Sequence, residues 1–222
     1  MFGVILENKM SALNKELIEY GDITVERVDA SVASFLDEDL VKAREIIEST
    51  TNANEKSHSI EHGCLKILGL HQPVAKDLRM GAAILRTSIE LERINILSAY
   101  IARYAIDTNQ NGTNHYKPPH IRFMSETVQN MMKDGVGSLV SQDIQLLKRS
   151  TKNYATLQDF YNQMFLQYDE SIFGSSHMYL MLVGRNLLSM GHHVMGMADR
   201  IAYMIVGKRV MHHKVFYNVL MR

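Results

Sequence analysis

The chain has 222 residues, with 24 basic and 24 acidic side chains, so its formal net charge is zero. A balanced charge argues against a nucleic-acid-binding protein, because such proteins usually carry a basic excess. No apolar run approaches the ~18 residues that suggest a membrane span. The single cysteine, Cys64, excludes an internal disulfide and is consistent with a reducing cytosol. Its helical spacing from Ile60 and Ile67 predicts a buried packing residue.

The first half predicts three long helices, because apolar residues recur there at spacings of three and four. The first helix covers about 10–35, and Asp37-Glu38-Asp39 then offers an N-cap for the next one. The second is expected to run without a break over about 40–67. Pro73 is expected at the first position of the third helix, which continues to about Ile106.

The second half repeats this plan. A polar segment at 108–119 ends in two prolines and reads as a linker. Three further helices follow, of which the fifth is capped by Ser141-Gln142-Asp143 and the sixth ends at Gly207. Residues 35–40 correspond to residues 139–144 at an offset of 104. A period of this length predicts an all-α protein made of two tandem three-helix bundles, with six long helices in total.

The expected domain boundaries follow from the linker. Residues 1–107 would form the first three-helix repeat and 108–119 the linker. Residues 120–222 would form the second repeat with a short basic C-terminal tail.

A motif at the start of the third predicted helix resembles the signature of the PhoU family, cytoplasmic regulators of phosphate uptake. The chain reads His-Gln-Pro-Val-Ala-Lys-Asp-Leu-Arg over 71–79, where the family has Gln-Gln-Pro-Val-Ala-x-Asp-Leu-Arg. It then reads Leu-Glu-Arg-Ile-Asn-Ile over 91–96, where the family has Leu-Glu-Arg-Ile-Gly-Asp. Asn95 and Ile96 are therefore departures from the pattern. The resemblance extends from about Leu13 to about His212 and implies the same pair of helical bundles.

The resemblance also implies a multinuclear iron or zinc cluster in each bundle, held by acidic pairs four residues apart. Carboxylates at this spacing share one helix face and suit hard cations. Of the eight expected acidic ligands, only Glu92 is present. The eight corresponding positions are Thr50, Asn54, Glu92, Ile96, Tyr154, Gln158, Leu188 and His192. We therefore expect no metal cluster and no other cofactor in this chain.

Histidines provide the alternative to this expectation. His192 and His193 stand at or beside a former ligand position, so Glu92, His192 and His193 form a weak alternative metal set. The former pocket would place His192 near Tyr154 or Gln158. The other close pair, His58 and His62, lies beside the buried stripe and is expected to be solvated.

Four charged residues of the signature have a structural or partner-binding interpretation. Glu92 and Arg93 suit an ion-pair node that fixes the register of the bundle, and Arg79 suits either that node or a partner carboxylate. Asp77 suits the positive end of the third helix. These four residues, Asp77, Arg79, Glu92 and Arg93, are the predicted node or partner-binding site.

The sequence contains no catalytic triad or phosphate-binding loop, so we expect no enzyme and no catalytic residue. By resemblance, the chain is a cytoplasmic adaptor that negatively regulates a phosphate ABC transporter and its sensor histidine kinase. Phosphate-starvation genes would then be repressed when phosphate is ample. The resemblance further implies a homodimer that reaches the membrane only through protein partners. The alternatives are an accessory protein of an ion-coupled phosphate transporter and a metal-binding helical-bundle protein.

Overall fold

The computed structural model describes residues 2–110, 119–166 and 175–208. These residues form helices only: α1 (Phe2–Leu36), α2 (Leu40–Glu48), α3 (Thr50–His71), α4 (Ala75–Gln110), α5 (Pro119–Ser141), α6 (Ile144–Leu166) and α7 (Ser175–Val206). The predicted all-α fold is confirmed. None of these helices is both long and apolar enough to cross a membrane. The predicted basic tail over 209–222 and the central part of the predicted linker, 111–118, lie outside the described residues.

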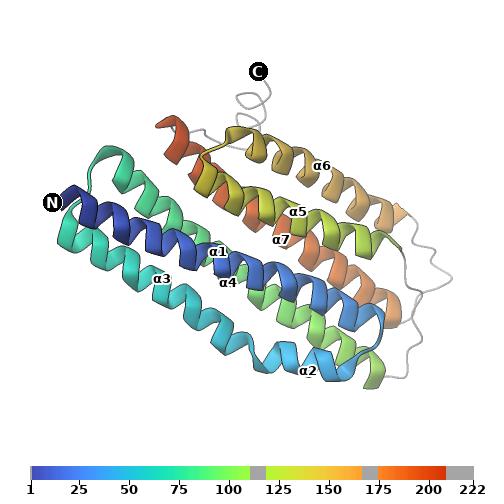
Figure 1. Cartoon of the computed structure of the whole chain (residues 1–222). Coiled ribbons are helices and arrows are strands. Elements are labelled where there is room, and N and C mark those ends of the chain that lie inside the picture. The colour runs from blue at the N-terminus through green and yellow to red at the C-terminus, as the bar shows by residue number, and fades with distance from the viewer. Residues whose placement is uncertain (1, 111–118, 167–174, 209–222) are drawn as a thin grey trace.

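Two groups of helices lie side by side and share one core (Figure 1). In the first group α1 packs against α2, α3 and α4, and in the second α5, α6 and α7 pack against one another. The groups meet through α4 against α7 and α1 against α5. Methionines fill much of the second group, including Met124, Met131 and Met190, which are fully buried. The division of the chain into two duplicated domains stays a prediction.

The turns after α1 and α5 have the same local conformation. Glu38 and Gln142 both adopt left-handed backbone angles, with φ of 60° and 56°. The next residues, Asp39 and Asp143, each accept a backbone N–H of the following helix with a side-chain oxygen, at 2.9 and 2.8 Å. Both predicted N-caps are therefore present, and they lie 104 residues apart, which agrees with the offset in the sequence.

The predicted second helix is broken at Ser49, which separates α2 from α3. Ser49 and Thr50 donate their side-chain hydroxyls to the carbonyl oxygens of Glu45 and Ile46 at 2.7 and 2.8 Å. Arg27 of α1 also donates to the Ile46 carbonyl, at 2.8 Å. Hydroxyl side chains compete with the helical backbone for these acceptors. The expectation of an unbroken helix was therefore wrong.

Pro73 does not open a helix, which corrects a second expectation. The helix α4 begins two residues later, at Ala75, and both Gln72 and Ala75 have positive φ, at 43° and 47°. A proline disfavours the right-handed α conformation in the residue before it, and Gln72, which precedes Pro73, ends α3 in the left-handed region. Gly207 ends α7 as predicted, with φ of 73° and its N–H donating to the Tyr203 carbonyl at 2.8 Å.

A small polar network lies in the core where α1 meets α4. Asn95 donates from Nδ2 to the hydroxyls of Tyr20 and Thr24, each at 3.0 Å, and all three side chains are fully buried. Burial raises the pKa of the Tyr20 hydroxyl to about 12, so Tyr20 is a neutral hydrogen-bonding group at physiological pH. Asn95, which departs from the family pattern, thus joins the two helices through polar contacts.

Replacing Tyr20 by phenylalanine should lower the free energy of unfolding by about 1 kcal/mol, because a buried hydrogen bond is lost while Asn95 keeps its bond to Thr24. Urea unfolding followed by circular dichroism measures the change. The control is Tyr100→Phe, since the Tyr100 side chain is exposed. Equal stability of the two variants would contradict the role given to this network.

Candidate functional site

The contact between α4 and α7 contains a buried carboxylate, Glu90, whose side chain is only 4% exposed. Arg86, one turn earlier on α4, places a guanidinium nitrogen 2.6 Å from Glu90 Oε1. His193 of α7 places Nδ1 2.7 Å from Glu90 Oε2. Both oxygens of the carboxylate are therefore paired, and one of the partners comes from the other half of the chain.

Gly196 supplies the space that the Glu90 side chain occupies. It lies on α7 within one turn of His193, and a Cβ atom at this position would stand 2.9 Å from Glu90 Oε1. That separation is too short for an ordinary contact between carbon and oxygen. A glycine at 196 thus lets α7 approach α4 closely while the carboxylate keeps both partners.

The ionisation of Glu90 reflects two opposing influences. Burial alone would raise the pKa of this carboxyl, but the hydrogen bond with His193 and the charge of Arg86 outweigh it. The pKa therefore lies below its ordinary value of 4.5. Glu90 is a carboxylate near neutral pH, and it holds α4 and α7 in one register.

This ion-pair node differs from the predicted one, whose partner-binding interpretation stays a prediction. Glu92 is half-buried, Arg93 is exposed, and no ion pair joins them within the described structure. Residues two apart on a helix point in nearly opposite directions, so only one of Glu90 and Glu92 can face α7. The i,i+4 spacing of Arg86 and Glu90 was a sequence signal for the node. The part played by His193 was not visible, because it depends on how α7 packs.

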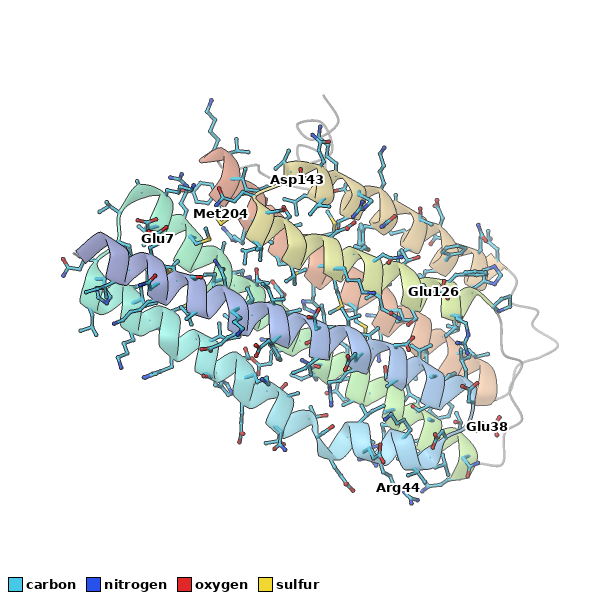
Figure 2. The ribbon with its side chains drawn as sticks, in the orientation of Figure 1. Glu7, Glu38, Arg44, Glu126, Asp143 and Met204 are labelled. Atoms are coloured by element: carbon cyan, nitrogen blue, oxygen red, sulfur yellow. The ribbon has the colours of Figure 1, made fainter. Side chains whose placement is uncertain are left out.

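Arg79 ties the start of α4 to the end of α7. Its Nε donates to the carbonyl oxygen of Met204 at 3.4 Å, and its guanidinium lies beside Gly207. Met204 lies in the last turns of α7 (Figure 2). A positive charge at a helix C-terminus is stabilising because the last carbonyls are unpaired and partly negative. Asp77 lies exposed in the first turn of α4, as expected.

The eight former ligand positions hold few acidic groups in the structure. Thr50 accepts a hydrogen bond from Arg27 at 2.8 Å, Asn54 is half-buried and Gln158 is exposed. The Tyr154 hydroxyl lies 3.5 Å from Nδ1 of His192, which agrees with the predicted position of this histidine. Within the described ranges, no three side chains of His, Cys, Asp or Glu form a group that could hold a metal.

The remaining predicted residues lie as expected. Cys64 is buried, and burial raises the pKa of its thiol to about 12, so the thiol is unreactive at neutral pH. His58 and His62 are exposed on α3. Sequence reasoning missed Arg27, a buried cation whose side chain lies where α1, α2 and α3 meet.

The fold and these contacts define a protein of two packed helical groups whose few buried charged residues join one helix to another. The sequence comparisons agree. A PhoU domain match covers residues 17–105. A protein of Methanothermobacter thermautotrophicus, the phosphate-specific transport system accessory protein PhoU homolog 2, is 60% identical over 222 residues, covering 100% of this chain and 99% of that protein. The chain therefore belongs to the PhoU family.

Solved structures show the same fold. The crystal structure of PhoU from Pseudomonas aeruginosa matches with a TM-score of 0.83 and 22% identity, covering 91% of this chain and 99% of that one. The phosphate transport system regulatory protein PhoU from Streptococcus pneumoniae matches with a TM-score of 0.83 and 17% identity, covering 96% and 100%. Family membership confirms that the chain is not an enzyme, since PhoU proteins are accessory and regulatory proteins.

Glu90→Gln should lower the free energy of unfolding at pH 7 by about 1–3 kcal/mol, because Arg86 and His193 lose a charged partner. A lowered carboxyl pKa stabilises the fold above the ordinary pKa, and this stability disappears as pH falls through the folded pKa. The wild-type stability should therefore fall as pH drops below about 5, and the variant curve should be flatter. Urea unfolding across pH tests both effects. The matched control is Glu92→Gln, which should behave like the wild type.

Arg79→Gln should cost about 0.3–1 kcal/mol, because the C-terminal end of α7 loses a cation. Arg93→Gln, on the same helix, should change stability by less than about 0.5 kcal/mol, since Arg93 is exposed. Thermal unfolding of the two variants makes the comparison. Equal losses would show that the contact with Met204 adds nothing to stability.

Proposed function

We propose that this chain is a cytoplasmic accessory protein of a phosphate transport system. In this proposal it acts as an adaptor that restrains a phosphate ABC transporter and its sensor histidine kinase when phosphate is ample. The observation that carries the proposal is the 60% identity, along the whole chain, to a relative named as a phosphate-specific transport accessory protein. An adaptor works through its contact surfaces rather than through a reactive centre. This fits the fold, because the buried charges described above join helices.

The turn between α3 and α4 supports this proposal with a surface suited to a protein partner. Leu70, Val74 and Leu78 are 68%, 75% and 47% exposed, although they are apolar. They lie within and beside the signature that resembles the family, at the same end of the bundle as the end of α7 (Figure 1). Exposed apolar residues on a positioned turn are typical of contact sites. We propose that the transporter ATPase binds here.

We further propose that the chain works without a metal cluster. Arg27 donates to Thr50, one of the former ligand positions, so a fixed positive charge lies where the family pattern has a carboxylate. A cation at this position repels a metal ion, and Tyr154 and Leu188 offer no good oxygen ligand in the other half. The homodimer implied by the resemblance is part of the same proposal.

A pull-down with the tagged chain should capture the phosphate ABC transporter ATPase and the sensor histidine kinase from the source cell. Val74→Ser should weaken ATPase capture about tenfold or more, because a central apolar contact is removed from the interface. Val41→Ser is the control, since Val41 is 67% exposed on α2, away from this turn.

The outcome decides between the proposals that the sequence left open. Capture of an ion-coupled phosphate transporter instead of the ATPase would favour the alternative accessory role. An equal effect of the two valine variants would remove the α3–α4 turn as the contact surface.

Elemental analysis of the purified chain should find iron and zinc well below one atom per chain. The physical reason is the loss of acidic ligands together with the charge of Arg27. The control is a PhoU protein that keeps the acidic pairs, purified in the same way. A stoichiometric, tightly bound metal would restore the metal-binding alternative.

A further inference from the structure

The buried guanidinium of Arg27 has hydrogen-bond acceptors but no opposite charge. Nη1 donates to the Ser49 hydroxyl at 2.7 Å, and Nη2 donates to the Ile46 carbonyl and the Thr50 hydroxyl, each at 2.8 Å. All three acceptors are neutral. The side chain is 9% exposed, and no carboxylate of the described residues lies within ion-pair distance of it. Burial without a carboxylate lowers the pKa of the guanidinium.

Arg27 lines a cavity of about 530 Å³ between α1, α2 and α3. The Nε atom of Arg27 is buried and has no acceptor among the described residues. Lys42 of α2 and Lys56 of α3 line the same cavity, together with the polar side chains of Ser49 and Asn52. Basic side chains of α1, α2 and α3 therefore line one space, and one of them, Arg27, is buried.

The cavity also contains two carboxylates, which set its net charge. Glu45 lies 3.3 Å from the Lys42 ammonium group, so these two charges largely cancel. Glu26 and Lys56 are both exposed. Neither carboxylate forms an ion pair with Arg27 within the described residues. The lining thus has three basic and two acidic side chains, and the guanidinium of Arg27 donates only to neutral acceptors.

A buried charge is costly unless a partner of opposite sign compensates it. Guanidinium and ammonium groups hold phosphate-type oxyanions through short, charge-assisted hydrogen bonds. We propose that this cavity binds a tetrahedral oxyanion of the phosphate type, either free or as part of a small organic molecule. Arg27 and Lys56 hold the oxyanion from α1 and α3, and Ser49 and Asn52 add neutral hydrogen bonds.

An occupied site would hold α3 against α1 beside the break at Ser49, because the anion would contact Arg27 of α1 and Lys56 of α3. This inference goes beyond the proposed adaptor function and does not depend on it. A failed pull-down would not contradict the oxyanion site, and a failed titration would not contradict the partner contacts.

Isothermal titration of the full chain with inorganic phosphate tests the proposal, up to about 10 mM because a single small anion binds weakly. We expect saturable binding that weakens about tenfold in Lys56→Gln, since one charged hydrogen bond is lost. The matched control is Lys66→Gln, an exposed lysine of the same helix that does not line the cavity. It should bind like the wild type.

Arg27→Lys should also weaken binding about tenfold, because the planar donor set is lost while the charge is kept. Circular dichroism reports whether Arg27→Lys folds. If Arg27→Lys does not fold, the titration of Lys56→Gln tests the oxyanion site. Adenosine monophosphate and sulfate in parallel titrations distinguish a free oxyanion from one carried by an organic group. The proposal is wrong if the folded wild type shows no saturable binding of any of these anions, or if Lys56→Gln and Lys66→Gln bind alike.

Discussion

The pairing of Glu90 with Arg86 and His193 is the constraint on which the arrangement of the helices depends. A carboxylate that is 4% exposed is strongly destabilising unless both oxygens find donors. Arg86 reaches Glu90 from α4 itself, but His193 can reach it at only one alignment of α4 and α7, and Gly196 is needed there to make room for the side chain. Hydrophobic contacts alone would tolerate a shift along the helix axes. The buried charge does not, so it fixes how the two halves of the chain meet.

The two halves share a plan but differ in the chemistry of their cores. In the first half, Tyr20, Thr24 and Arg27 follow one buried line of α1 and bond to α2, α3 or α4. In the second half, methionines such as Met131 and Met132 occupy the interior. Directional bonds specify one arrangement, whereas thioether side chains adapt to irregular space. The second half has its own directional contact in the pair of Asp134 on α5 with Arg149 on α6, and the rest of its core is adaptable packing.

The features that could be predicted from the sequence are those set by residues close together in the chain. The long helices followed from apolar spacing, and Asp39, Asp143 and Gly207 marked helix ends because caps act locally. The features that could not be predicted depend on a distant partner. The break at Ser49 involves Arg27 of another helix, and the choice of Glu90 over Glu92 depends on the packing of α7. Arg27 continues the three-or-four spacing of the buried residues Leu13, Leu17 and Tyr20. This spacing was a sequence signal that the Arg27 side chain is buried.

The pairing of Glu90 with His193 also has a consequence for biosynthesis. The two residues are separated by 103 positions, so Glu90 leaves the ribosome well before its partner exists. At an elongation rate of about 5–20 residues per second, the delay is about 5–20 seconds. During that interval the α7-facing side of α4 is uncovered in the nascent chain. Chaperone capture of such an intermediate would protect this side until the last helix emerges and completes the bundle.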